Sequence, residues 1–140
     1  MKNFRLSLYT FIITCAMAIL SGADISAQDS KLVVRLARIK VDLAQLEDYK
    51  IALKEEIETS IRVEPGVLSL NAVADKNNPT DITILEMYLN EDAYRNHLET
   101  LHFKKYKTAT KDMVKSLELV ETTPILLGTK LNKNNDSIGE

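Results

Sequence analysis

The stretch KLVVRLARIKV, Lys31 to Val41, decides the fold of this chain. It is rich in β-branched and apolar residues and predicts a β-strand. Side chains alternate between the two faces of a strand, which here carry Leu32, Val34 and Leu36 on one side and Val33, Ala37 and Ile39, interrupted by Arg35, on the other. A strand that is apolar on both faces is usually covered on both. In so small a domain its own helices can cover one face, and we expect a second copy of the chain to cover the other.

A helix is predicted to follow this strand. Asp42 can cap a helix that starts at Leu43. Glu64-Pro65-Gly66 ends it, because a proline disfavours helical geometry in the residue before it. The predicted apolar face, close to helical spacing, consists of Leu46, Tyr49, Leu53, Ile57 and Ile61.

Two further strands are predicted around a short polar loop. Val67–Ala74 and Ile82–Leu89 are rich in strand-forming residues. The loop between them, DKNNPTD, consists of residues typical of turns. This pattern favours an antiparallel hairpin.

The last third of the chain predicts a second helix and a final strand. Asn90 can cap the helix, which we expect to run, with or without a break, to about Leu119. Pro124 then stops it, and the alternating segment Ile125–Leu131 is predicted to be the last strand. Residues 132–140 are polar, and we expect a flexible tail there.

The order strand, helix, strand, strand, helix, strand predicts an α+β, ferredoxin-like domain over residues 31–131. The sheet of such a domain carries its helices on one face. The opposite face needs a cover, which agrees with the two apolar faces of the first strand and predicts a homodimer.

The first 27 residues predict a signal peptide. Lys2 and Arg5 precede the apolar run Leu6–Leu20, and Ile25-Ser26-Ala27 offers a cleavage site. The run is shorter than the roughly 20 residues that a membrane-spanning helix needs. We therefore expect an exported protein, periplasmic or secreted, with no membrane attachment after cleavage. An uncleaved N-terminal anchor is the alternative, and lipidation at Cys15 fits less well.

Composition restricts the classes of partner and of site. The formal net charge is −2, and nothing in the charge pattern indicates a nucleic-acid partner or an anionic membrane surface. Cys15 is the only cysteine and lies in the predicted signal, so we expect neither a disulfide nor thiolate chemistry in the mature protein. The chain has no glycine-rich phosphate loop and no CxxC, HExxH or GxSxG motif.

The two histidines of the chain, His97 and His102, lie five residues apart in the second predicted helix. On a continuous helix their directions differ by about 140°, because each residue turns about 100°. They converge only if the helix breaks between them, and Thr100 could cap a new turn there. Because of this spacing we expect no metal site. The histidines are either polar residues at a surface or pocket rim, or one of them is a proton shuttle.

Glu86 lies in the middle of the third predicted strand, on the face of Ile82, Ile84 and Tyr88. A carboxylate on an apolar face is either buried with a partner or lines a polar pocket. Burial would raise its pKa unless a cation or a donor pairs with it. Two interpretations stay open: a catalytic role, or a structural ion pair with one of the cations Arg35, Arg38 and Lys130.

Three aromatic residues could line a cavity for a flat aromatic ligand. They are Tyr88, Phe103 and Tyr106. The alternative is that they are ordinary core residues.

Several segments together resemble the antibiotic biosynthesis monooxygenase (ABM) domain family. The matching segments are Glu64–Leu68 for the turn after its long helix, Ile84–Tyr88 for its third strand, and Asn90–Tyr94 with His97, Thr100, His102 and Phe103 for its second helical region. The resemblance extends over about Lys31 to Leu131.

The resemblance implies a ferredoxin-like domain that pairs sheet to sheet into a dimeric α+β barrel. Several proteins of this family oxidise quinols or polyketide-like aromatics with dioxygen and with no metal or flavin cofactor. In such proteins the positions of His97 and His102 lie near the pocket, and Glu86 matches a recurrent strand position. The implied partners are a second copy of the chain, a small aromatic substrate and dioxygen.

The chain departs from the family pattern at several positions. Val67 stands where a cysteine is usual, Leu70 where a tyrosine is common, and Leu101 where a proline precedes the second histidine. The haem-degrading branch of the family uses a tryptophan and an asparagine of the first strand. This chain has neither, so haem degradation is disfavoured.

The resemblance thus implies a cofactor-independent monooxygenase that oxidises a small electron-rich aromatic such as a quinol. His102 or His97 would act as the base, and Glu86 would orient the histidine or the substrate. The alternative is an exported dimer that binds a small hydrophobic ligand without catalysis. A third interpretation is a structural dimer whose cavity is filled by side chains.

Overall fold

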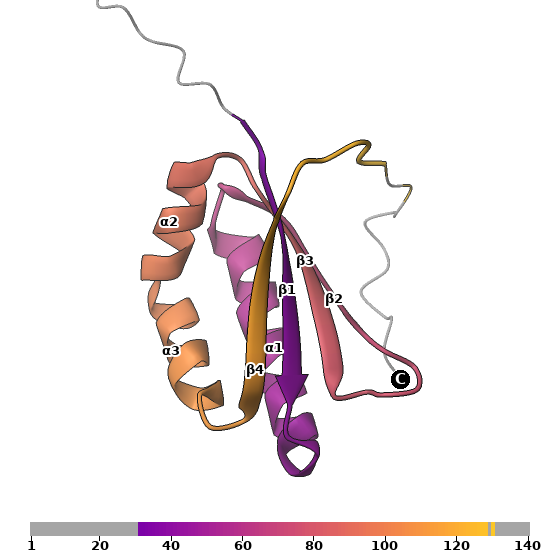
Figure 1. The fold of residues 1–140 in the computed structure, drawn as a ribbon. Helices are drawn as coiled ribbons and strands as arrows, with labels where there is room; N and C mark the ends of the chain where they lie inside the picture. Colours follow the sequence, from indigo (N-terminus) through magenta and orange to yellow (C-terminus); the bar gives the residue numbers. More distant parts are fainter. Residues whose placement is uncertain (1–30, 129, 131–140) are drawn as a thin grey trace, which may run out of the picture.

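One antiparallel sheet with its helices makes up residues 31–128 and 130, the part of the chain that this computed structural model describes. The strands are β1 (Val33–Val41), β2 (Val67–Ala74), β3 (Asp81–Tyr88) and β4 (Val114–Thr122). The helices are the 3-10 helix η1 (Leu43–Gln45), α1 (Leu46–Val63), α2 (Glu91–Glu99) and α3 (Leu101–Thr110). The strand order is β2-β3-β1-β4, and all paired strands are antiparallel. The predicted α+β, ferredoxin-like fold is confirmed (Figure 1).

The predicted signal peptide, residues 1–27, and the predicted tail, residues 132–140, lie outside the described residues. Within the described range no helix is long and apolar enough to cross a membrane.

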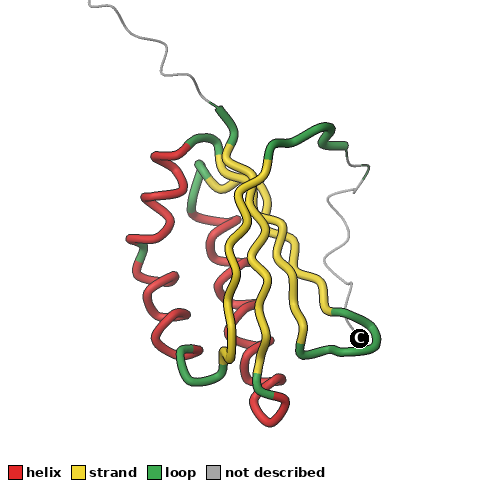
Figure 2. The backbone as a smooth tube through the Cα atoms, viewed as in Figure 1, coloured by secondary structure: helices red, strands yellow, loops and turns green. Residues whose placement is uncertain are grey.

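β1 lies in the middle of the sheet, between β3 and β4. On one face its residues Ala37 and Ile39 are buried in a core with α1, and the helices cover this face (Figure 2). On the other face Leu36 stands in register with Leu85 of β3 and Val120 of β4. All three of these side chains are half-buried. The strand therefore has the two apolar faces that its sequence predicts.

The start and end of the first helical region follow local signals. The Asp42 carboxylate accepts a hydrogen bond from the Ala44 amide at 2.9 Å, and α1 ends at Val63, just before Glu64-Pro65. The predicted apolar face of α1 is wrong near the C-terminal end of the helix. Ile61 is 48% exposed, and two polar residues, Glu56 and Ser60, are buried instead. The reason is that this end of α1 faces His97 of α2, and Glu64, the residue after α1, reaches both His97 and His102 of α3.

Thr100 divides the second helical region into α2 and α3. Its backbone is extended, with φ −66° and ψ 151°, and its hydroxyl accepts a hydrogen bond from the Phe103 amide at 3.3 Å. Asn90 caps α2 in the same way, accepting from the Ala93 amide at 2.8 Å. A break at Thr100 was one of the two forms expected for this helix, and it turns the direction of α3 relative to α2 (Figure 1).

The predicted end of this region is wrong. The helix stops at Thr110 and not near Leu119, and the last strand of the described chain is Val114–Thr122. The described part of the predicted strand, residues 125–128 and 130, is not a strand, and its residues 129 and 131 lie outside the description. Met113, Leu117 and Val120 fit helical spacing, whereas Leu117 and Leu119 fit the alternation of a strand, so the local sequence did not separate the two. Pairing of β4 along nearly the whole of β1 decides for the strand, whereas Ile125 and Leu126 remain exposed.

Candidate functional site

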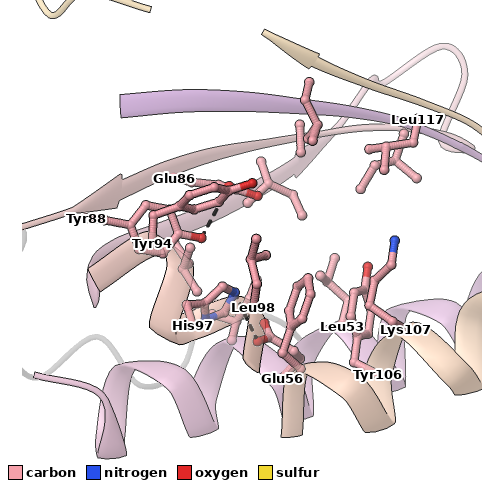
Figure 3. A pocket seen from close by; sticks show the side chains of 17 residues that line it. Leu53, Glu56, Glu86, Tyr88, Tyr94, His97, Leu98, Tyr106, Lys107 and Leu117 are labelled. Carbon is pink, nitrogen blue, oxygen red and sulfur yellow. Dashed lines mark hydrogen bonds and ion pairs between the residues drawn. The ribbon is translucent and has the colours of Figure 1, made fainter. Parts of the chain in front are cut away.

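A cavity of about 280 Å³ lies between the sheet and the helices (Figure 3). Most of its wall is apolar, and includes Ile39, Leu53, Ile84, Leu98, Leu117 and Leu119. The three aromatic residues predicted for a ligand pocket, Tyr88, Phe103 and Tyr106, all contribute to the wall. Side chains thus leave open space here, which disagrees with the interpretation as a purely structural dimer.

Glu86 projects from β3 into this cavity. Its carboxylate accepts a hydrogen bond from the Tyr88 hydroxyl at 3.3 Å. Burial raises the pKa of Glu86, and the Tyr88 hydrogen bond only partly opposes this shift. Burial and the neighbouring Glu86 also raise the pKa of Tyr88, so its hydroxyl stays protonated. The carboxyl of Glu86 therefore keeps its proton to a higher pH than an exposed glutamate does.

Of the three cations proposed as partners of Glu86, Arg35 and Arg38 pair with other carboxylates, and Lys130 is exposed. The guanidinium of Arg35 lies 3.8 Å from the ring centre of Tyr94 and forms an ion pair with Glu121 at 3.2 Å. Arg38 forms an ion pair with Glu118 at 3.3 Å. Of the two interpretations of Glu86, this geometry favours the pocket group over the structural ion pair.

His97 lies at the wall of the cavity and is only 3% exposed. Its ring packs between the rings of Phe103, with centres 4.6 Å apart, and Tyr88, with centres 5.3 Å apart. Its Nδ1 is 3.0 Å from Oε1 of Glu64, and its Nε2 is 3.8 Å from Oε1 of Glu56. The imidazole is thus fixed in orientation, with carboxylates near both nitrogens.

His102 comes from α3 on the other side of the Thr100 break and reaches the same carboxylate. Its Nε2 lies 2.6 Å from Oε1 of Glu64. It borders a separate hollow of about 40 Å³ together with Ala52 and Ala109. Of the two histidines predicted as the base, the structure therefore places His97, not His102, on the wall of the main cavity.

Glu64 joins the two histidines and was not predicted as a site residue. An ionised carboxylate can only accept hydrogen bonds, so both histidine nitrogens donate to it. Burial raises the pKa of Glu64, but the hydrogen bonds from His97 and His102 outweigh this and hold its pKa below the usual value. When Nδ1 of His97 donates to Glu64, the lone pair of a singly protonated ring is on Nε2, which lies 3.8 Å from Oε1 of Glu56.

Glu56 and Ser60 complete the cluster and were also missed. The buried Ser60 hydroxyl donates to Oε1 of Glu56 at 2.7 Å. Both residues belong to the buried face of α1, which continues from Tyr49 and Leu53. Glutamate and serine at spacings of three and four residues on a core-facing helix were the signal that could have revealed them.

Comparison with known proteins identifies the family. Residues 32–109 match the sequence pattern of the antibiotic biosynthesis monooxygenase domain. The chain belongs to this family. No curated protein gives a significant match.

Solved structures of ABM-type proteins show the same fold. One from Bacteroides thetaiotaomicron, described as a candidate antibiotic biosynthesis monooxygenase, is 54% identical, covers 73% of this chain and 97% of its own, and has a TM-score of 0.70. A candidate monooxygenase from Lactobacillus acidophilus is 34% identical and has a TM-score of 0.63; the match covers 64% of this chain and 43% of that one. A third structure, from Nitrosomonas europaea, is 23% identical and has a TM-score of 0.64; the match covers 69% of this chain and 92% of that one. At this identity the likeness shows the fold alone. The ABM family match and the 54% identical neighbour support a monooxygenase-like function.

Proposed function

We propose that this ABM-family protein is a cofactor-independent monooxygenase that oxidises a small electron-rich aromatic, such as a quinol, with dioxygen. The observation that carries the proposal is a buried histidine, His97, held by Glu64 at the wall of an apolar cavity. The cavity volume of about 280 Å³ is close to the lower end of the roughly 300–1,000 Å³ of ligand pockets. A ligand of one or two rings fits that size.

His97 is the proposed base. Its Nε2 would accept the phenolic proton of a substrate bound in the cavity. Glu64 holds the ring by its Nδ1–H at 3.0 Å and would stabilise the imidazolium that forms. His102 donates to the same Glu64 oxygen and would act through Glu64, as a positioning residue.

The deprotonated substrate would then react with dioxygen directly. The phenolate gives one electron to dioxygen, and the resulting pair of radicals forms a bond between oxygen and a free ring carbon. Loss of the ring hydrogen and cleavage of the O–O bond leave one oxygen atom on the ring and release the other as water. A quinol with a free ring position would thus become a hydroxyquinone, and dioxygen takes up the four electrons.

Glu86 is the proposed orienting group. Because burial raises its pKa, its protonated carboxyl can donate a hydrogen bond to a substrate oxygen. It stands on the sheet side of the cavity, whereas His97 stands on the helix side (Figure 3). The two groups could therefore hold a flat ring between them.

Export and dimer formation are part of the same proposal. The signal-like first 27 residues support export to the periplasm or beyond the cell. The apolar sheet face around Leu36, which the helices leave open, supports pairing with a second copy.

Oxygen uptake with single variants tests the proposal. We expect the purified protein to consume dioxygen with at least one member of a panel of hydroquinones and polyphenols. His97→Gln should lower kcat by about 10²–10⁴-fold with little change in KM, and His102→Gln should lower it less. Equal uptake in His97→Gln would sink the proposal. Saturable binding of an aromatic ligand without uptake would favour the alternative, a non-catalytic binding dimer.

A further inference from the structure

We propose that Glu56, Glu64, His97 and His102 bind one divalent transition-metal ion, with Zn²⁺ as the best match. Each residue offers one ligand atom, and these atoms all lie within 4.8 Å of one another. Two imidazole nitrogens and two carboxylate oxygens form a ligand set of the kind that zinc binds with four-fold coordination. The site lies behind the wall of the main cavity, between α1 and the junction of α2 with α3.

The separations fit a single ion. Around zinc, with bonds of about 2.0–2.1 Å, tetrahedral ligand atoms lie about 3.3 Å apart. The contacts to Oε1 of Glu64 here are 2.6 Å from Nε2 of His102 and 3.0 Å from Nδ1 of His97, while the other nitrogen of His97, Nε2, lies 3.8 Å from Oε1 of Glu56. An ion would take only one of the two His97 nitrogens. One ligand atom from each residue lies within 4.8 Å of the others, so side-chain shifts of about 1 Å would bring the four atoms onto one ion.

The charge of the cluster favours a cation. With both carboxylates ionised and both imidazoles neutral, the four side chains carry a charge of about −2 in a largely buried place. Their hydrogen-bond partners in the described structure are Ser60 and one another. A buried carboxylate is stable only when its charge is compensated, and a divalent ion or protons on the histidines would do this.

The ligand residues are held in place before any ion arrives. Glu56 accepts from the buried Ser60 at 2.7 Å, and the rings of Tyr88 and Phe103 pack against His97. The capped break at Thr100 directs His102 towards Glu64. Contacts of this kind around metal ligands strengthen metal binding. The sequence analysis expected no metal site even with a break at Thr100, because it did not identify Glu56 and Glu64 as neighbours of the histidines.

The ion and the proposed base would exclude each other. A neutral imidazole that binds a metal through one nitrogen keeps its proton on the other. Ion-bound His97 would therefore have no lone pair for a substrate proton, and the ion would inhibit the oxidation. This consequence rests on the proposed function, whereas the binding site itself does not.

The test is a titration of the chelator-treated protein with Co²⁺, whose visible absorption reports four-fold coordination, followed by displacement with Zn²⁺. We expect one ion per chain. His102→Gln and Glu64→Gln should each weaken binding at least about 100-fold, since loss of outer contacts alone costs about 10–100-fold. Glu55→Gln, which changes an exposed neighbour paired with Lys105, should bind like the parent.

Two results would overturn the site. One is a parent protein that shows neither a saturable Co²⁺ absorption band nor a saturable heat of Zn²⁺ binding by calorimetry. The other is binding that survives unchanged in both ligand variants, which would place the ion on the surface. Circular dichroism spectra would show that the variants fold, and His102→Gln, at a partly exposed position, is the variant least at risk. Because the readout is spectroscopic, it stays informative if no quinol is oxidised.

Discussion

Glu86 is surrounded on its sheet face by apolar residues and by the Tyr88 hydroxyl. Its pKa in the folded protein is raised above the value of an exposed glutamate, first of all by burial. The folded state therefore holds this proton more tightly than the unfolded state does. The contribution to stability is fully present below the unfolded pKa and is lost as the pH rises through the folded pKa.

Replacement of Glu86 by glutamine should remove this pH dependence. Glutamine has the same shape and stays neutral, so Glu86→Gln should be more stable than the parent at pH 8 and gain nothing at pH 4. Thermal unfolding of both proteins across this range measures the difference in Tm. An exposed control, Glu118→Gln on β4, should show no such rise with pH. A Tm difference for Glu86→Gln that is independent of pH would contradict the raised pKa.

The positions of the site residues depend on where the helices begin and end. The break between α2 and α3 depends on one side chain, because Thr100 accepts from the Phe103 amide and also donates to the His97 carbonyl at 2.8 Å. This break allows His97 and His102 to share one carboxylate. A continuous helix would direct the two rings about 140° apart.

Thr100→Ala should therefore lower the free energy of unfolding by about 1 kcal/mol, within the usual range of about 0.5–2 kcal/mol for a lost cap. Urea unfolding measures it. Thr108→Ala is the matched control, because its hydroxyl donates only to the Lys104 carbonyl within α3 and alanine favours a helix. The prediction fails if the two variants lose the same stability.

The turn after α1 is fixed by the close approach of α2. A Cβ atom added at Gly66 would lie 2.5 Å from the Cβ of Ala93. Because Gly66 has no side chain, Ala93 of α2 can approach the turn closely. This turn follows Glu64, which contacts both histidines.

Gly66→Ala should be destabilising by about 1–3 kcal/mol, as expected for an overpacked contact. Ala93→Gly in the same chain should recover part of this loss, because it removes the opposing methyl group. A double-mutant cycle from urea unfolding gives the coupling between the two positions. Gly128→Ala, where an added Cβ meets nothing within 4 Å, is the control. Purely additive effects of the two changes would rule out the steric explanation.

At the scale of the whole molecule, the sheet has one face covered by helices and one that they leave open (Figure 1). Leu36, Leu85 and Val120 lie side by side on the open face, on three neighbouring strands. An apolar sheet face of this kind is stable when a second layer covers it. The proposed homodimer would supply that layer.

A charge on this face should therefore separate the dimer. We expect sedimentation equilibrium to show a dimer for the parent and a larger monomer fraction for Leu36→Glu. Ile51→Glu, at a residue of α1 that is 68% exposed, should stay dimeric. A parent protein that is monomeric at all concentrations would show the prediction of a homodimer to be wrong.

The sequence by itself determined the features that depend on neighbours in the chain. The caps at Asp42 and Asn90, the end of α1 before Pro65 and the hairpin around residues 75–81 rest on contacts within a few residues. The two-faced character of β1 was also readable, because alternation along a strand is a local property. These signals together predicted the ferredoxin-like order, and the family match agrees with it.

Only the tertiary structure decided where the last strand lies and which side chains meet at the site. β4 is a strand because it pairs with β1, about 80 residues away along the chain. Glu64 meets His97 and His102 across 33 and 38 residues. Whether a polar side chain on a helix faces water or a partner depends on how the elements pack, and packing depends on the whole chain at once. Local spacing, which set His97 and His102 apart, therefore could not show that one carboxylate joins them.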